Sequence, residues 1–527
     1  MARPGGTPQQ QGLILQRGHT ELLLHQLEDR LLVAFRSSDV DLLDIVPGLM
    51  YRPLPSGQPD ILFEEILVPP EDFATSLRAA CQHPDILFAY PVYQLADSAE
   101  GFVYLTQQIT LQFAPEVSPA AQKAIGDRHY LKKIRPLPGA DQTFIYELTA
   151  HTDPDPLRLT QILQQDPAIA LAEPNVLLPL AVRQMSLATN PQGRHWYLDA
   201  IQIPQAWQMT KGDRQTTIAV LAPDLDLENS AEPTAATSET PYGAIPEIRP
   251  TTWGNTIAQL AIDVAPECTL LLLQLPQYLD DALLEKVIEA AIAQGAAVIL
   301  LAWQLATING PLSLRQSLAL HRAATQGNRG QGCLLVTGAG DANRPLAGII
   351  YERHWPNQLF QGPTAWLDGK GNHPAVVTVS GCTEANKKAS HSNWGEAVSL
   401  CGPTNPGTPT LWLPEQGMVA VPPEISDDLG AEIDPVEALN QQGSTLEAAA
   451  LVAGVAALVW SVNPKLTGWA VREILQTTAE KIVDLTGDRQ LQLNLGTYDA
   501  QGHSPWFGYG RVNALAAVAL AQGNQPD

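Results

Sequence analysis

The segment from residue 443 to residue 459 constrains the fold of this chain more than any other. It reads Gly443-Ser-Thr-Leu-Glu-Ala-Ala-Ala-Leu-Val-Ala-Gly-Val-Ala-Ala-Leu-Val459. From Ala450 onward no charged residue interrupts the apolar run, and its small side chains allow a helix to approach a sheet closely. We therefore predict a helix buried at the centre of an α/β domain.

The same segment resembles the serine helix of the subtilisin-like proteases, the subtilase or peptidase S8 family. In that family a Gly-Thr-Ser-aromatic-Ala-Ala/Thr-Pro-x-Val-Ala-Gly pattern places the attacking hydroxyl at the helix N-terminus. When the pattern is aligned backwards from Val452-Ala453-Gly454 without a gap, the serine position falls on Leu446. A leucine side chain has no group that can attack a carbonyl.

Two further motifs resemble the stretches that carry the acid and the base of the family. Thr217–Leu221 resembles the first core strand, after which the family has its catalytic aspartate, and here the next residue is Ala222. Thr252–Ala261 resembles the helix that begins with His-Gly-Thr in the family, and Trp253 stands at the histidine position.

The oxyanion position is also changed. Gly332–Asp341 resembles the strand that ends in Ala-Gly-Asn in the family, whose asparagine donates to the oxyanion, and Asp341 takes its place. The resemblance covers roughly the C-terminal two-thirds of the chain, and three more stretches support it without carrying chemistry: residues 195–212, 389–395 and 508–514.

Serine catalysis needs a hydroxyl, a base that takes its proton, a carboxylate that orients the base, and donors aimed at the oxyanion. The four aligned positions, Ala222, Trp253, Leu446 and Asp341, all lack the group required. The resemblance therefore implies a catalytically degenerate subtilase, with no catalytic residue at the expected places.

Displaced residues are the alternative. Asp224 lies two residues past the expected acid, and Ser444 lies two residues before the expected serine. However, the chain has no histidine between His195 and His321, and we expect His373 and His391 to lie elsewhere in the fold. A displaced serine triad would therefore lack its base.

The related sedolisins use glutamate and aspartate in place of histidine and aspartate, with an aspartate at the oxyanion position. Asp341 fits that last feature, and Asp263 and Glu267 follow Trp253. Sedolisins still need the serine, and Leu446 does not supply it.

Simpler interpretations compete at two positions. Trp253 is either a core aromatic that fills the space of the lost imidazole or a surface on which a ligand stacks. Asp224, Asp226 and Glu228 are either a solvated loop or a structural calcium site, since carboxylate oxygens suit that ion. We predict no other cofactor.

The N-terminal part contains an internal repeat. His83–Pro91 and Asp166–Pro174 share two prolines seven residues apart, at an offset of 83 residues, and each follows a helical stretch. A split βαββαβ fold suits each copy. The ending of the second copy, Leu171–Val176, resembles that of subtilase propeptides, and the first copy is a degenerate version of the same unit.

We therefore predict a doubly wound, mostly parallel α/β domain of the subtilisin type, preceded by two small α+β, ferredoxin-like units. The expected division of the chain is a flexible tail (1–25), two propeptide-like units (26–98 and 99–182), a lead-in linker (183–213) and the main domain (214–527), which carries inserts near 344–372 and 405–442. The aromatic residues of the first insert form a partner surface or cover the rim of the domain, and the pattern does not separate these alternatives.

Composition excludes some classes of partner. The excess of 55 acidic over 31 basic residues gives a net charge of −24, which argues against nucleic acid and against an anionic membrane surface. The sequence has no run of 18 uninterrupted apolar residues, so it predicts no helix that spans a membrane. Five cysteines without a CxxC pair, and an N-terminus without a signal-like apolar core, indicate a reduced, cytoplasmic protein.

The sequence thus predicts a pseudo-peptidase, a scaffold, binding or regulatory protein with a protein or peptide partner. Because no nucleophile is left to cut the chain, we expect the propeptide-like units to stay attached, with residues 178–192 in or near the ancestral cleft. The alternative is a serine endopeptidase with a displaced or non-standard catalytic set.

Overall fold

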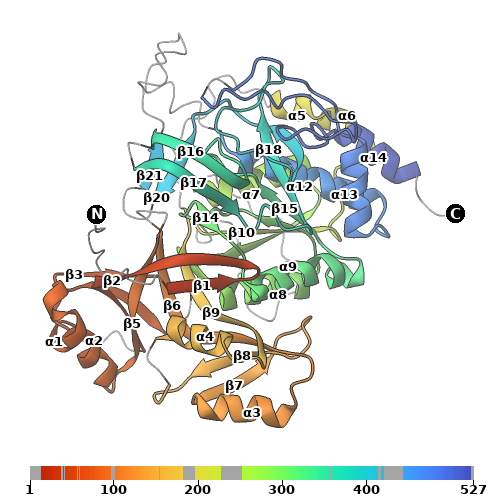
Figure 1. Ribbon diagram of the computed structural model, residues 1–527. Helices are drawn as coiled ribbons and strands as arrows, with labels where there is room; N and C mark the ends of the chain where they lie inside the picture. Colours follow the sequence, from red (N-terminus) through yellow and green to blue (C-terminus); the bar gives the residue numbers. More distant parts are fainter. Residues whose placement is uncertain are drawn as a thin grey trace. The chain divides into compact units, whose positions relative to one another are not determined.

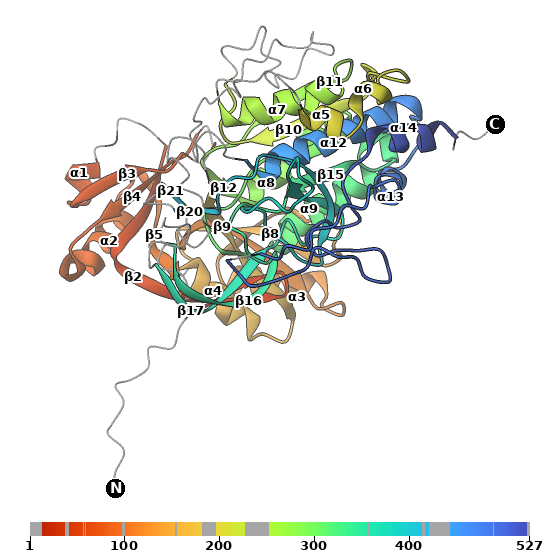
Figure 2. The same ribbon diagram turned by 90° about the horizontal axis from the view of Figure 1, so that it is seen from above.

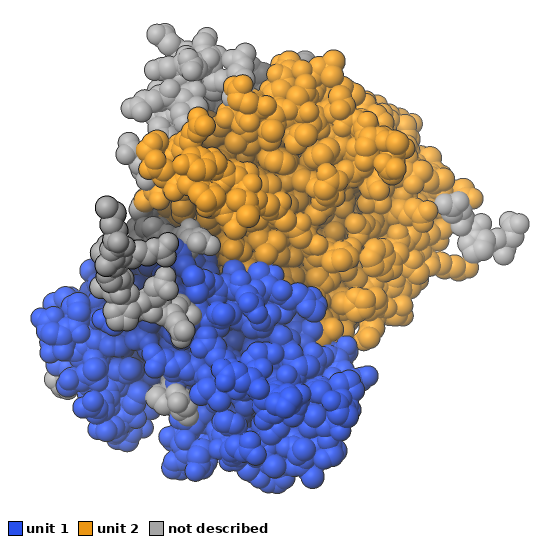
Figure 3. Space-filling model, viewed as in Figure 1, with its two compact units in different colours: residues 1–178, 280–282, 313–315 blue, residues 179–279, 283–312, 316–527 orange. Residues whose placement is uncertain are grey.

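The computed structural model (Figure 1; Figure 2, from above) describes residues 13–523 except for 37–39, 41, 56, 58–59, 97–100, 153–154, 182–195, 227–251, 357–358, 414–416, 421–442 and 489. The chain divides into two compact units, coloured separately in Figure 3. Unit 1 comprises residues 1–178 with the short segments 280–282 and 313–315. Unit 2 comprises residues 179–279, 283–312 and 316–527.

Unit 1 contains the order β-α-β-β-α-β twice, as the repeat in the sequence predicts. The first copy runs through β2 (Thr20–Phe35), α1 (Leu42–Ile45), β3 (Met50–Pro53), β4 (Leu62–Leu67), η1 (Pro70–Asp72), α2 (Phe73–Gln82) and β5 (Ile86–Leu95). The second runs through β6 (Phe102–Phe113), α3 (Pro119–Arg128), β7 (Leu131–Pro136), β8 (Thr143–Leu148), α4 (Pro156–Gln164) and β9 (Ile169–Pro179).

The two copies share one antiparallel sheet. In each copy the first strand pairs with the last and with the third, so that β2 lies between β4 and β5, and β6 lies between β8 and β9. Strands β5 and β6 join the copies through Tyr93↔Val103 and Gln94↔Phe102. Each copy keeps its own apolar core under its helices.

The predicted flexible tail is wrong for residues 13–25. Residues Leu13–Arg17 form strand β1, which pairs with the beginning of β2 in the register Leu13↔Leu24. The apolar run Leu13-Ile14-Leu15 has the composition of a strand, and the Gln- and Gly-rich residues before it hid this signal.

Unit 2 is built on a six-stranded, fully parallel sheet in the order β11-β10-β13-β15-β18-β19. This confirms the predicted fold class. Its strands are β10 (Thr217–Ala222), β11 (Thr269–Gln274), β13 (Ala296–Leu301), β15 (Leu334–Gly338), β18 (Val376–Cys382) and β19 (Val398–Pro403), and β12 (Tyr278–Asp280) precedes α8. Its helices are α5 (Trp196–Ala200), α6 (Ile203–Ala206), α7 (Trp253–Val264), α8 (Asp281–Ala293), α9 (Leu314–Gln326), η2 (Asn328–Gly330), α12 (Thr445–Val462), α13 (Gly468–Thr477) and α14 (Ala514–Gly523).

Helices cover both faces of this sheet, because successive strand residues point to opposite sides. Ile218 and Val220 of β10 pack into the core that contains α7 and α12. Ala219 and Leu221 pack into the core that contains α8 and α9. Both faces of the sheet are therefore buried from solvent.

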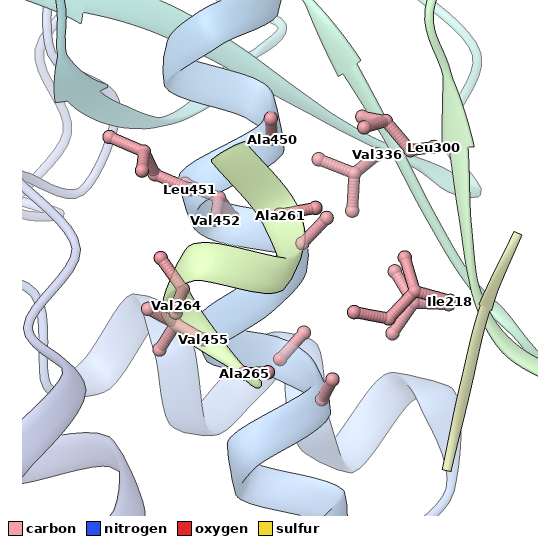
Figure 4. Packing of buried hydrophobic residues seen from close by; sticks show 14 of the residues in the cluster. Ile218, Ala261, Val264, Ala265, Leu300, Val336, Ala450, Leu451, Val452 and Val455 are labelled. Atoms are coloured by element: carbon pink, nitrogen blue, oxygen red, sulfur yellow. The ribbon is translucent and has the colours of Figure 1, made fainter. Parts of the chain in front are cut away.

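Helix α12 is the central helix that the sequence predicts, and its middle lies between α7 and the sheet (Figure 4). Gly454 permits this approach, because a Cβ at that position would lie 2.5 Å from Cβ of Val264 and 2.6 Å from the carbonyl oxygen of Ala261. Among the described residues α12 is the one helix long and apolar enough to cross a membrane, but 83% of that window is buried inside the protein. Its hydropathy is accounted for by its place in the core.

Both inserts carry strands, although the sequence indicated loops. A three-stranded sheet of β14 (Asn309–Gly310), β17 (Phe360–Asp368) and β16 (Ala347–Trp355) lies beside a hairpin of β20 (Thr410–Leu413) and β21 (Gly417–Ala420), and the two share a small core. Trp355 and Trp366 are buried there, whereas Tyr351 and His354 are exposed. The tryptophans therefore cover the rim, and the remainder of the second insert lies outside the described residues.

Candidate functional site

Ser444 is the N-cap of α12, not a free nucleophile. Its hydroxyl oxygen accepts a hydrogen bond from the Leu446 amide at 3.1 Å, and its own amide donates to the Glu447 carboxylate at 3.3 Å. These bonds form a capping box, whose signature Ser444-Thr-Leu-Glu447 is readable in the sequence. Thr404 supports it by donating to the Glu447 carboxylate at 2.9 Å. Ser444 has no exposed surface.

Asp341 lies against this helix N-terminus, at the turn that follows β15. Its Oδ2 accepts from the Ser444 hydroxyl at 2.8 Å, and its Oδ1 accepts from the Thr445 amide at 2.8 Å and from the Thr445 hydroxyl at 3.0 Å. The Gln304 side chain adds a bond of 3.4 Å to Oδ2. Asp341 is 3% exposed.

The Ser444 hydroxyl both donates and accepts a hydrogen bond. It donates to the Asp341 carboxylate and accepts from the Leu446 amide. A carboxylate at a helix N-terminus is favoured both by charge-assisted hydrogen bonds and by the helix dipole. The carboxylate of Asp341 therefore acts as an acceptor at the position that the sequence pattern aligns with the oxyanion donor.

The three triad-equivalent positions lie around one apolar core. Ala222 ends β10 and is fully buried, and Leu446 in the first turn of α12 is 4% exposed, both within the same cluster. Trp253 begins α7 and is partly buried against that cluster. This packing matches the interpretation of Trp253 as a space-filling aromatic residue.

Asp224, the displaced candidate for the catalytic acid, is hydrogen-bonded to the N-terminal turn of helix α7. Its Oδ1 accepts from the Gly254 amide at 3.0 Å, at the first turn of α7. Burial raises the pKa of this carboxyl, and the Gly254 and Trp253 amides oppose that rise. Asp224 therefore stabilises the N-terminus of α7.

The expectation that His391 lies far from the site is wrong. Its Nε2 is 3.8 Å from Oδ1 of Asp341, and its Nδ1 donates to the Pro406 carbonyl at 3.0 Å. Asp341 thus contacts both Ser444 and His391, whereas serine catalysis requires the imidazole between the hydroxyl and the carboxylate. His391 and Asp341 are 50 residues apart in the sequence, so no local sequence pattern predicts their contact.

His373 bonds a different serine. Its Nε2 is 3.1 Å from the Ser317 hydroxyl, while its Nδ1 accepts from the Ala375 amide at 3.3 Å. The neutral ring therefore carries its proton on Nε2 and donates to Ser317, so it is not placed to act as a base toward that hydroxyl.

Residues 179–181, at and just beyond the end of β9, lie in unit 2 and make main-chain hydrogen bonds there. The Leu180 amide donates to the Gln277 carbonyl at 2.7 Å, and the Ala181 amide donates to the Gln304 carbonyl at 2.8 Å. The Pro179 carbonyl accepts from the Ala306 amide at 3.0 Å, and Leu180 pairs antiparallel with Leu305. Leu180 is 5% exposed among the leucines of the α8–α9 face. We call residues 304–306 together with Gln277 the peptide groove.

The groove and the α12 N-terminus are linked through Gln304. Its main-chain carbonyl accepts a hydrogen bond from the Ala181 amide, and its side-chain amide donates one to Asp341. The residues expected beyond Ala181, including His195, lie outside the described part of the chain.

Of the loop proposed as a calcium site, Asp224 and Asp226 lie among the described residues. There, no group of three or more His, Cys, Asp or Glu side chains could hold a metal ion. Asp224 accepts from the Gly254 amide of α7, whose N-cap is Thr252, and Glu228 falls outside the described residues. All five cysteines are free thiols.

Comparisons with known proteins agree with the fold. Two curated relatives are both named "Calcium-dependent protease": one from Nostoc sp. is 32% identical over 221 residues, and one from Trichormus variabilis is 31% identical over 221 residues. Each match covers 41% of this chain and 29% of the relative, so the chain spans less than a third of these relatives.

Solved structures with a similar fold include fervidolysin from Fervidobacterium pennivorans, a keratinolytic enzyme related to subtilisin (16% identity, TM-score 0.47, 80% of this chain and 61% of that chain). Another is the epidermin leader peptide processing serine protease of Staphylococcus aureus (12% identity, TM-score 0.46, 80% of this chain and 100% of that chain). The model of the subtilase family, peptidase S8, matches residues 251–510. Residues 251–510 of this chain therefore form a subtilase-family domain.

Proposed function

We propose that this protein is a pseudo-peptidase: a non-catalytic member of the subtilase family that acts as a scaffold, binding or regulatory module for an extended peptide or protein segment. One observation carries the proposal. The residue aligned with the nucleophile, Leu446, is buried in the core, and the neighbouring hydroxyl of Ser444 is fully buried and bonded in both directions. Neither side chain is available to attack a peptide carbonyl.

The peptide groove supports the binding part of the proposal. Strand addition supplies main-chain hydrogen bonds to any extended segment, and a pocket for alternate side chains adds selectivity. Residues 179–181 of the same chain take this place through three main-chain bonds. A partner must therefore compete with a tethered segment, whose effective concentration is high.

The test is a fluorophosphonate probe on the purified full-length protein, with an active subtilase as the positive control. The proposal expects no stoichiometric labelling and no conversion of the chain to a fragment that begins near Met185. Ser444→Ala is the matched variant, and it should leave the background signal unchanged. Labelling at or near one probe per chain, lost in Ser444→Ala, would overturn the proposal.

One contact favours the alternative of a serine endopeptidase with a displaced catalytic set. The 2.8 Å bond from the Ser444 hydroxyl to Asp341 gives that hydroxyl a basic partner, with His391 on the other carboxylate oxygen. Such a dyad would have to expose Ser444 before it reacted. The same labelling experiment separates the two functions.

A further inference from the structure

Strand β16 is an edge strand without the usual protection against pairing. It ends the three-stranded sheet β14-β17-β16, and among the described strands it pairs with β17 alone (Figure 1). Edge strands usually carry lysine, proline or a bulge, because an open edge pairs readily with other chains. Strand β7 of the same protein follows this rule with Lys132, Lys133 and Arg135. From Ala347 to Tyr351, β16 has no lysine, no proline and no bulge.

The side chains of β16 alternate between the core of the insert and solvent, as those of a strand do. Ile350 packs against the small core of the insert, and Glu352 is 2% exposed on the same side. Ile349 and Tyr351 lie on the other side and are 74% and 64% exposed. Arg353 follows them and is also exposed. Two large apolar side chains therefore stand in solvent on the edge strand.

The main-chain groups of Ile349 and Tyr351 also point to the open edge. The Leu367 amide of β17 donates at 3.0 Å to the carbonyl that precedes β14, away from β16, so the pair Ala347↔Leu367 is not hydrogen-bonded. Such pairs alternate with bonded ones in an antiparallel ladder, so the pairs of Ile349 and Tyr351 with β17 are of the same kind. Pro363, opposite Tyr351, agrees with this because it has no amide hydrogen to donate.

This edge is complementary to itself. A two-fold axis at Ile350 between two antiparallel copies of β16 places Ile349 opposite Tyr351 of the partner subunit, and Tyr351 opposite Ile349 of the partner subunit. Because both residues point their main-chain groups outward, this register satisfies the open N–H and C=O groups of both strands. A β-branched residue opposite an aromatic one is a favourable cross-strand pair. Arg353 falls opposite Ala347 of the partner subunit, so no like charges meet.

We propose that β16 is an interface between two copies of this chain, which join their three-stranded sheets into one continuous sheet about a two-fold axis at Ile350. A contact in which the same edge is used by both copies closes at the dimer. The paired stretch, residues 347–353, is a small contact beside the ~800 Å² per partner of a stable interface, so the dissociation constant is on the order of 10⁻⁵ M. This inference does not depend on the proposed function.

Sedimentation velocity of the full-length chain between ~1 and ~200 µM tests the proposal, in ~0.15 M salt to screen the net charge of −24. Wild type should pass from monomer to dimer in this range. Tyr351→Lys puts a lysine on the open edge, and Ile349→Pro removes an outward N–H group that β17 does not use. Each should raise the dissociation constant at least about tenfold. Gln361→Lys, on the same exposed face but on β17, is the matched control and should leave the dimer unchanged.

Amide hydrogen exchange identifies the surface. When the dimer forms, the amides of Ile349 and Tyr351 should gain protection, whereas those of Ile350 and Glu352, which already bond to β17, should not change. If Ile349→Pro does not fold, Tyr351→Lys, a change at an exposed side chain, still decides. Wild type that stays monomeric at ~200 µM leaves the edge to a strand of another protein and overturns the proposal. A dimer that Tyr351→Lys retains, or one without protection at Ile349 and Tyr351, also overturns it.

Discussion

Asp341→Asn tests the hydrogen-bond network between Asp341 and the N-terminus of α12. The substitution keeps the size of the side chain but removes its charge and one of its two acceptor oxygens. At present the carboxylate accepts from the Ser444 hydroxyl, the Thr445 amide and the Thr445 hydroxyl at 2.8, 2.8 and 3.0 Å. In asparagine an NH2 group would replace either Oδ1 or Oδ2, and this NH2 group would then face a hydrogen-bond donor instead of accepting from it.

The expected loss follows from these bonds. A hydrogen bond to a charged group contributes about 1.5–3 kcal/mol, against about 0.5–1.5 kcal/mol for a neutral one, so three bonds lose roughly 3 kcal/mol of charge assistance. The interaction of the carboxylate with the α12 N-terminus adds about 0.3–2 kcal/mol. We expect Asp341→Asn to lower the free energy of unfolding by about 3–5 kcal/mol.

The assay is urea unfolding followed by tryptophan fluorescence, with Asp199→Asn as the control. Asp199 is exposed on α5, and its substitution should change the free energy of unfolding by less than about 0.5 kcal/mol. A double-mutant cycle with Ser444→Ala should give a coupling above about 1 kcal/mol. A loss below about 1 kcal/mol in Asp341→Asn would refute the charge-assisted network.

Three more perturbations give distinct outcomes. Leu446→Ser should cost about 2–5 kcal/mol in urea unfolding, because it removes a buried side chain, and it should remain unlabelled by fluorophosphonate; labelling of the new serine would mean that a base lies within reach. Glu173→Gln tests a pH dependence: burial raises the pKa of Glu173 to about 7 from 4.5, so its contribution to stability is present below pH 4.5 and is lost as the pH rises through 7. Wild type should therefore lose roughly 3 kcal/mol relative to Glu173→Gln between pH 4.5 and 8, and a difference that does not vary with pH would contradict this. Leu180→Asp should release residues 179–181, so that a synthetic peptide of residues 176–184 binds the variant at least tenfold more tightly than wild type by fluorescence anisotropy, and equal affinities would exclude competition for the groove.

Regular periodicity made the core of the fold predictable. The uninterrupted small-residue run gave α12, and short apolar segments gave β10, β13 and β15. The hairpin of β16 and β17 was not predictable in the same way, because its buried face consists of scattered residues such as Glu352 and Trp355. The buried Glu352 pairs with Arg344 and accepts from the Trp366 indole, and no local pattern contains these contacts.

The candidate site was predictable at single positions but not as a network. The sequence pattern aligns Ala222, Trp253 and Leu446 with the triad one by one, and these assignments stay predictions. The contacts of Asp341 with Ser444 and Gln304 join segments 103 and 37 residues apart, and only the fold brings them together. The capping box was the readable part of this network, because its residues lie within a single turn.

The residues around the N-terminus of α12 satisfy one another's hydrogen-bonding and packing needs. An aspartate placed alone at a buried turn would be an uncompensated charge, which is costly. Here Asp341 meets a serine hydroxyl, a threonine hydroxyl and a helix N-terminus, while Leu446 in the same first turn packs into the apolar core. Changing Asp341 or Leu446 alone therefore removes a bonded or packed partner. The proposed function accounts for these contacts as stabilising ones, since they satisfy the polar groups at the α12 N-terminus.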